Sequence, residues 1–151
     1  MSDNRVEGFV GKWGSRTRED NVFLLYNGEE THGDNNLGGF WFKDASQSYS
    51  NYNVSGVSRI PKNKWIHIVG VWRNTDGYTA IYKNGIVDNF TYNTDSIANV
   101  LHYHTSYNAA IGNWGYNHGS NYNMIGSIDE VRIYNRALND NEIRALYLLQ
   151  E

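Results

Sequence analysis

Short runs of alternating apolar and polar residues dominate the chain, and turn residues separate them. A period of two places the apolar side chains on one face, which is typical of half-buried β-strands. Strands separated by turn residues in this way predict an all-β fold, an antiparallel two-sheet sandwich or jelly roll. A weaker strand candidate lies within residues 43–58, and the clear candidates are Val6–Trp13, Asn21–Tyr26, Gly38–Lys43, Trp65–Arg73, Tyr78–Lys83, Ile86–Tyr92, Ala109–Gly112 and Ile125–Tyr134.

The segment Trp65–Arg73 is apolar on both of its faces. Trp65 and Val69 lie on one face, and Ile66 and Trp72 lie on the other. A strand that is covered on both faces is usually flanked by strands on both sides. We therefore expect this strand to be central in its sheet.

Two elements carry strong local signals. Asn84-Gly85 stands between two strand-like runs, and this dipeptide favours a tight hairpin because both turn residues need positive φ. Asn139 precedes Glu142 by three residues, which is the spacing of a capping box at a helix N-terminus. An apolar stripe follows, so we expect one short C-terminal helix containing Ile143, Leu146, Tyr147 and Leu149.

Composition narrows the class of protein. The 151 residues fit one domain, 1–151. Without cysteine, the chain has no disulfide scaffold, thiolate zinc site or thiol nucleophile. A net charge of −3 argues against nucleic acid as a partner, and no apolar run is long enough to insert in a membrane. The first residues contain no apolar segment typical of a signal peptide.

Four motifs in order resemble laminin-G-like (concanavalin A-like lectin/glucanase) jelly-roll domains. They are the Trp-x-His strand from Trp65, the segment Ala80–Gly85, the strand Ala110–Asn113, and the closing segment Gly126–Leu138 with Glu142-Ile143 after it. The resemblance covers roughly residues 9 to 147 and implies the same jelly-roll fold.

One departure from the resemblance concerns the first strands. Domains of this family usually begin with several more strands, whereas this chain starts at a strand resembling a later element, Phe9–Trp13. A sandwich without those strands would leave an unpaired edge. Three explanations are open: the sequence is cut from a larger chain, a partner chain supplies the strands, or the domain is a minimal variant. Our hypothesis is self-association or association with a neighbouring domain.

The chain lacks the constellations that catalysis requires, so we expect no enzyme activity. Glycoside hydrolysis needs two carboxylates that face one cleft. Glu29-Glu30 and Asp129-Glu130 are adjacent pairs, which point to opposite faces of a strand, and the Glu-x-Asp-x-x-Glu pattern of the family's hydrolases is absent. His102 and His104 lack a third zinc ligand, and His67 fits a packed position in the core.

Asp129 is the candidate metal ligand. It has the parity of Val131 and Ile133, so we expect it to point toward the core. A buried carboxylate needs hydrogen bonds or a cation. Laminin-G-like domains often hold a structural calcium, and the resemblance implies that Asp129 could contribute to such a Ca²⁺ site. The alternative is a carboxylate satisfied by backbone N–H groups, by Arg132 or by Arg136.

Carbohydrate binding suits a chain with 15% aromatic residues and 21 asparagines. Sugar rings stack their C–H faces on aromatic side chains, and their hydroxyls pair with amides and carboxylates. The alternative is that these residues only build turns and that Trp114 tucks under the sandwich edge. Trp65, Trp72, Phe40 and Phe42 are expected in the core. The candidate ligand-binding residues, taken from two loops, are Trp114, Tyr116, Asn117, His118, Tyr122, Asn51 and Tyr52.

Two functions from different classes follow. The first is a non-catalytic module for carbohydrate or protein binding and adhesion, which recognises a glycan or surface protein within an extracellular or surface assembly. The alternative is a structural building block or decoration protein of a virion, surface layer or filament, whose missing strands come from a neighbour. A relic of a glycosidase or lyase is a distant third.

Overall fold

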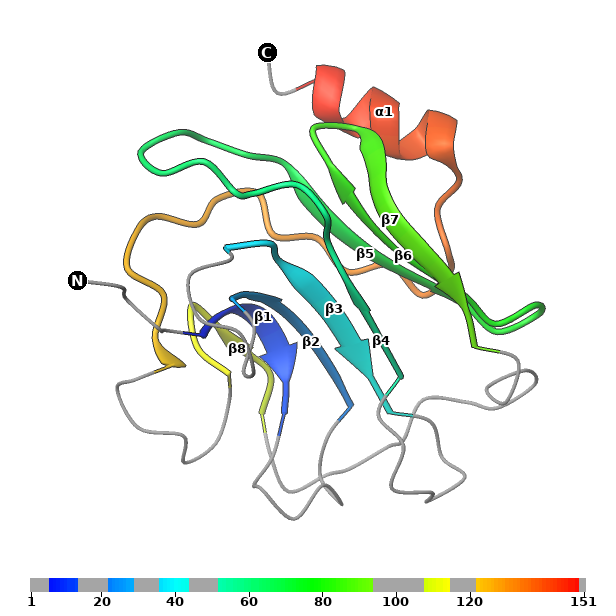
Figure 1. Ribbon diagram of the computed structural model, residues 1–151, viewed down its shortest axis with the longest axis horizontal. Helices are drawn as coiled ribbons and strands as arrows, with labels where there is room; N and C mark the ends of the chain where they lie inside the picture. Colours follow the sequence, from blue (N-terminus) through cyan, green and yellow to red (C-terminus); the bar gives the residue numbers. More distant parts are fainter. Residues whose placement is uncertain are drawn as a thin grey trace.

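The structure is a computed structural model that describes residues 6–13, 22–28, 36–43, 52–93, 108–114 and 122–149. These residues form a β-rich fold with a helix near the C-terminus (Figure 1). The elements are β1 (Glu7–Lys12), β2 (Phe23–Asn27), β3 (Gly39–Phe42), β4 (Tyr52–Ser55), β5 (Ile68–Arg73), β6 (Tyr78–Lys83), β7 (Ile86–Tyr92), β8 (Ala110–Ile111) and α1 (Asp140–Leu148).

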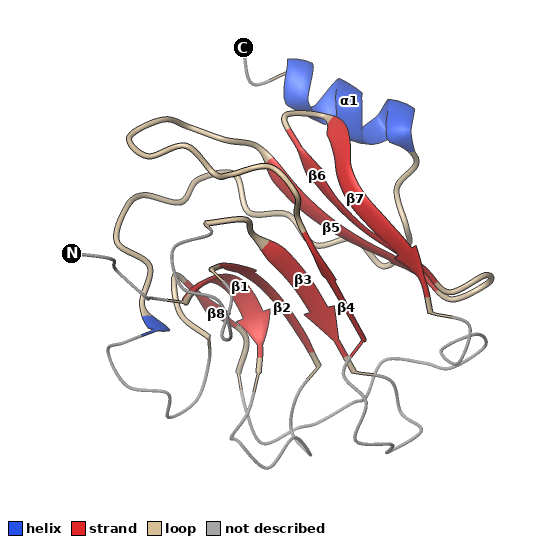
Figure 2. Ribbon diagram, in the orientation of Figure 1, coloured by secondary structure: helices blue, strands red, loops and turns tan. Residues whose placement is uncertain are grey.

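The strands form two antiparallel sheets. One sheet has the order β4-β3-β2-β1-β8, and the other has the order β5-β6-β7. The helix α1 covers the face of the three-stranded sheet that points away from the five-stranded sheet (Figure 2). This architecture confirms the antiparallel two-sheet sandwich expected from the alternation.

Apolar side chains from both sheets fill the space between them. Leu25, Val54 and Ile81 form the buried centre of this layer. Gly70 brings the sheets close together, since a Cβ at this position would lie 2.4 Å from the Phe40 ring. Phe40 packs in this layer, as expected, and the buried ring of Phe42 lies 4.8 Å from Trp72 between ring centroids.

The hairpin predicted at Asn84-Gly85 is confirmed. Both residues have positive φ, 50° and 76°, as a two-residue turn requires. The turn also lies against the helix, because a Cβ on Gly85 would be 3.1 Å from the Cβ of Tyr147. Glycine is therefore needed at this position for conformation and for space.

The C-terminal helix begins as the sequence predicts. The Asn139 side chain accepts a hydrogen bond from the Glu142 backbone at 3.0 Å, and the Glu142 carboxylate accepts one from the Asn139 backbone at 2.9 Å. These bonds satisfy two N–H groups that a helix end leaves without partners. The helix then packs on the outer face of the three-stranded sheet through a cluster of Val71, Ala80, Tyr82, Leu138 and Ile143.

The expectation that the strand after Trp65 is central is wrong for the described part of the chain. β5 is the edge of its sheet, and Trp65, expected in the core, is 72% exposed. The strand is nevertheless apolar on both faces, because the other sheet lies on one side and the helix cluster on the other. The other sheet and the helix cluster therefore explain why both faces of β5 are apolar, and a second neighbouring strand is not needed to explain it.

The strand expected at Ile125–Tyr134 is also absent. This segment is extended loop, visible as the tan trace that leads to the linker before α1 in Figure 2. Its apolar side chains are exposed, and Ile133 is 67% exposed. The alternating pattern alone does not form a strand, because a strand requires a neighbour to bond its backbone and no described strand lies in register beside this segment.

Candidate functional site

Trp114, a predicted ligand-binding residue, lies in a buried aromatic cluster. Its side chain is 3% exposed and packs with Val6, Leu24 and Tyr26 on the outer face of the five-stranded sheet. A ring that is covered in this way cannot stack on a sugar. The structure therefore corrects this assignment in favour of the alternative, in which Trp114 tucks under the sandwich edge.

The remaining loop candidates are only partly described. Tyr122 is half-buried, and its ring centroid lies 4.5 Å from that of Trp114, so it helps to cover the cluster. The side chain of Tyr52, at the start of β4, lies outside the described residues. Four other candidates also fall outside them and remain predictions: Tyr116, Asn117, His118 and Asn51. His102 and His104 lie outside them as well.

Asp129 does not point into the core. The residue is exposed, and its Oδ1 accepts a hydrogen bond from the Glu130 backbone N–H at 2.8 Å. The alternation fails here because residues 125–134 are not in a sheet. Within the described ranges no three His, Asp or Glu side chains are grouped as a metal site requires, and Asp129 has no second carboxylate ligand grouped with it there. Calcium binding stays a prediction that would need ligands from other parts of the chain.

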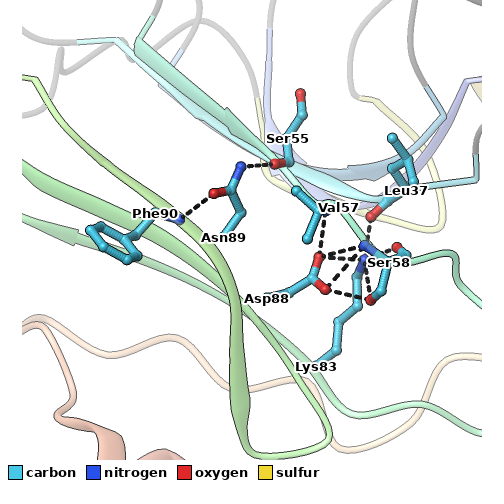
Figure 3. Close-up of polar contacts among 8 residues, drawn as sticks. All are labelled: Leu37, Ser55, Val57, Ser58, Lys83, Asp88, Asn89 and Phe90. Carbon is cyan, nitrogen blue, oxygen red and sulfur yellow. Dashed lines mark hydrogen bonds and ion pairs between the residues drawn. The ribbon is translucent and has the colours of Figure 1, made fainter.

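In the described part of the chain, a buried carboxylate belongs to Asp88, on β7. It accepts hydrogen bonds from the Val57 backbone at 2.8 Å, from the Ser58 backbone and hydroxyl, and from Lys83 Nζ at 2.8 Å (Figure 3). Only 7% of each charged side chain is exposed. Burial alone would raise the pKa of Asp88, but the hydrogen bonds from Lys83, Ser58 and Val57 outweigh it and hold the pKa below its usual value.

Lys83 occupies an oxygen-lined cradle next to Asp88. Its ammonium also donates to the carbonyl oxygens of Leu37, at 2.5 Å, and of Ser58. These oxygens are of the kind that would bind a metal cation, and the lysine ammonium fills their centre instead. The group joins the segments after β4 and before β3 to the β6–β7 hairpin, so its function is to tie the two sheets together. Sequence reasoning missed it, although a Lys and an Asp on opposite arms of the hairpin were a visible signal.

An exposed aromatic patch lies on the outer face of β6 and β7. It consists of Tyr78, Phe90 and Tyr92, whose ring centroids lie 5.6–6.0 Å apart, and we call it the β6–β7 aromatic patch. Register places the rings together, because Tyr78 pairs with Tyr92, and Phe90 pairs with Ala80 two residues along β6. Phe90 is 51% exposed and Tyr92 is 55% exposed. Exposed rings grouped in this way are typical of a binding surface.

Polar groups border the β6–β7 aromatic patch. Arg73 and Asp76 form a two-point ion pair, with N–O distances of 2.9 and 2.7 Å, and the Arg73 guanidinium lies 4.7 Å from the Tyr78 ring centroid. The hydrogen bond from Arg73 lowers the pKa of Asp76, so the carboxylate is charged at neutral pH. The patch therefore combines stacking surfaces with charged hydrogen-bonding groups.

A hydrogen-bonded chain holds the base of the patch. The Tyr78 and Tyr82 hydroxyls lie 3.0 Å apart, and the Tyr82 hydroxyl donates to Asp140 Oδ1 at 2.7 Å. Burial and these contacts raise the pKa of Tyr82, so it stays a neutral donor. Sequence reasoning missed the patch, because the exposure of these rings depends on which elements pack over the outer face of β6 and β7.

A large open cleft lies on the other side of the molecule. Its volume is about 2220 Å³. It is lined by β5, the loop before β5, residues 124–138 and inward-facing residues of the five-stranded sheet such as Phe9, Leu25 and Phe40. His67, expected at a packed position in the core, is half-buried and lines this cleft, with its ring stacked on Tyr147 at 6.0 Å. Burial, and then the charge of Arg132, lower the pKa of His67, so its ring is neutral near pH 7. We call this cavity the open cleft.

Comparisons with known proteins agree with this fold. Residues 9–144 match the family model described as the concanavalin A-like lectin/glucanases superfamily. A native heptameric SAP-like pentraxin from Limulus polyphemus is 18% identical with a TM-score of 0.63, which shows a shared fold. An S-layer domain-containing protein (residues 221–444) from Clostridium thermocellum is 19% identical, and its TM-score of 0.46 is too low to support an argument.

The solved structures that resemble this chain are longer than it is. Each likeness covers 95% of this chain but only 64% of the solved chain, so this chain spans less than two thirds of either structure. The search among curated proteins gives no match. Within the described residues, no helix is long and apolar enough to cross a membrane.

Proposed function

The chain belongs to the concanavalin A-like lectin/glucanases superfamily, and from this premise we propose that it is a non-catalytic recognition module that binds carbohydrate. The proposed site is the β6–β7 aromatic patch. The observation that carries the proposal is the group of three neighbouring rings, two of them more than half exposed, beside a charged Arg73–Asp76 pair.

The chemistry of the patch suits a neutral, hydroxyl-rich ligand. The exposed rings of Phe90 and Tyr92 provide apolar surface for the C–H face of a sugar ring. Arg73 and Asp76 keep about two fifths of their side chains exposed, so their remaining donors and lone pairs are accessible to hydroxyl groups. Because the two charges neutralise one another, the border offers directional hydrogen bonds without a strong preference for a charged ligand.

Three of the described carboxylates lack the environment of a general acid. Asp76, Asp88 and Glu142 each have a lowered pKa and a cationic partner within 2.9 Å. A general acid for glycoside hydrolysis needs a raised pKa, which comes from burial or a neighbouring like charge. These three groups have the opposite electrostatic environment, and we propose no catalytic role for them.

A glycan array tests this proposal. Binding should fall about ten-fold in Phe90→Ala and in Tyr92→Ala, equivalent to ~1.4 kcal/mol each. Tyr134→Ala, which removes a partly exposed ring on the open cleft, is the matched control and should bind as the unmodified chain does. If no glycan binds at millimolar concentration, or if all three variants bind equally, the proposed site is wrong.

A second candidate function is a structural one, as a building block or decoration protein of a larger surface assembly. The open cleft favours it, because a sandwich with a large uncovered apolar wall is suited to association. We propose an extracellular or surface location for both functions. A native assembly of many copies, measured by light scattering at physiological concentration, would favour the structural role.

A further inference from the structure

β5 is an edge strand without the protection that edges usually have. β4 and β8 are short edges of four and two residues, and the edge strand β7 carries Asp88 in its interior. Short edge strands and charges within an edge prevent accidental pairing. β5 has six residues, Ile-Val-Gly-Val-Trp-Arg, and no charge before its last position. It therefore lacks both features that protect the other edge strands.

The backbone groups on the free side of β5 can be assigned. The Asn84 N–H donates to the carbonyl of His67 at 2.8 Å, and hydrogen-bonded and non-bonded pairs alternate along an antiparallel ladder. The next hydrogen-bonded pairs along the ladder are therefore those of Val69 and Val71, whose N–H and C=O groups bond to β6. The N–H and C=O groups of the intervening residues, Ile68, Gly70 and Trp72, point away from β6 toward the open cleft.

The open cleft separates β5 from a second segment that is not paired in a sheet. Its far wall is the alternating segment 125–134, whose apolar side chains are exposed and whose backbone lies outside both sheets.

The loop at the entrance to the cleft is basic. Arg59, Lys62 and Lys64 line the cleft just before β5, and none of them forms an ion pair with another described residue. A ligand that enters at this end would gain from negative charge beside these residues.

From these observations we infer that the open cleft is a strand-acceptor site for a separate polypeptide. The occupant is an extended segment that alternates apolar residues, adds to the free edge of β5, and carries acidic residues at the end beside Arg59, Lys62 and Lys64. Main-chain hydrogen bonds provide the affinity, and the alternating side chains and acidic end provide the specificity. This inference is independent of the proposed carbohydrate site.

Synthetic peptides test the acceptor site on the full chain. The probe is a nine-residue peptide with two glutamates followed by alternating valine and threonine. One control has two lysines in place of the glutamates, and another has prolines that remove alternate N–H donors. Hydrogen exchange at Ile68, Gly70 and Trp72 is the measurement, with Val69 and Val71 as internal references.

The expected result is fast exchange at Ile68, Gly70 and Trp72 in the free chain, and at least ten-fold slower exchange with the acidic peptide. The proline peptide should protect nothing, and the lysine peptide should bind several-fold more weakly at low salt. Lys62→Glu combined with Lys64→Glu changes only exposed side chains and should reverse the preference between the two charged peptides.

Three results would overturn the inference. Protection of Ile68, Gly70 and Trp72 in the free monomer would show that the chain closes its own edge. Protection that rises with protein concentration and without peptide would identify a second copy as the occupant. Equal exchange with and without the acidic peptide would show that β5 does not accept a strand. Binding to the glycan array is unaffected by any of these results, so the two proposals fail separately.

Discussion

The two sides of the sandwich differ in how their sheets are joined. On the side of β4 and β7, which we call the closed side, Asn89 Nδ2 donates to the Ser55 carbonyl at 2.7 Å, and Asp88 and Lys83 bind the neighbouring segment. On the side of β5, the open cleft separates the sheet from residues 125–134. Hydrogen bonds between polar groups join the two sheets on the closed side, whereas apolar side chains remain exposed beside the open cleft.

The same contrast holds for single ion pairs. Lys83–Asp88 on the closed side and Arg132–Glu130 at the open cleft have similar N–O distances, 2.8 and 2.6 Å. The first pair is 7% exposed on each side chain, and the second is 46% and 55% exposed. Because water screens an exposed pair, similar geometry gives very different consequences when one partner is removed. Burial, more than distance, decides the importance of each contact.

The largest expected effect is at the buried pair. Lys83→Met leaves the Asp88 carboxylate in place without its cation, and should lower the free energy of unfolding by about 3–5 kcal/mol. Arg132→Met at the open cleft is the matched control and should leave the urea midpoint unchanged. If both variants shift the midpoint equally, burial does not distinguish the two sides.

A smaller effect is expected from apolar truncation. Ile81→Ala removes a fully buried side chain between the sheets and should cost about 2–5 kcal/mol. Ile133→Ala removes an equal volume from an exposed position and should change stability by no more than about 0.5 kcal/mol. Thermal unfolding of the two variants tests the comparison, and an equal loss in both would mean that residues 125–134 already pack in the isolated chain.

The smallest expected effect concerns pH and the helix that follows the open cleft. The hydrogen bonds from Arg136 and the Asn139 backbone lower the pKa of Glu142 from 4.5 to about 2. A lowered carboxyl pKa stabilises the fold at pH values above 4.5, and this contribution is lost as the pH falls toward 2. Glu142→Gln retains a capping side chain but cannot titrate, so its melting temperature should fall less between pH 5 and pH 2.5.

Arg136→Met is the companion variant for the pH experiment, because it removes the main cause of the lowered pKa. Asp88 also loses its charge in acid, in the unmodified chain and in both variants. The difference between unmodified chain and variant therefore isolates Glu142. An identical loss of melting temperature in all three proteins would contradict the prediction.

Local signals in the sequence predicted the elements well where those elements depend on neighbouring residues. The turn at Asn84-Gly85 and the capping box at Asn139 were confirmed, because positive φ and helix capping are decided within four residues. The candidate site was predicted less well. Trp114 is an aromatic residue in a polar loop, but the side that such a ring faces depends on how the loop folds back over the sheet.

Two errors have one physical cause. The strand after Trp65 was expected to be central, and residues 125–134 were expected to pair, yet the first is an edge and the second is a loop. The alternation of apolar and polar residues indicates which side chains can be buried. Backbone pairing in a sheet also requires a second strand at a distance of about 4.8 Å. In the described structure that second strand is missing beside both segments, on opposite walls of one cleft.

The sequence by itself determined the strand periodicity, the hairpin turn, the helix start and the family resemblance, since each depends on residue types at short fixed spacings. Only the tertiary structure decided that Trp114 is covered, that Asp88 and not Asp129 is the buried carboxylate, and that Tyr78, Phe90 and Tyr92 form a common exposed surface. The reason is that burial is a property of contacts between segments distant in the chain, and no local pattern contains the segment that does the covering.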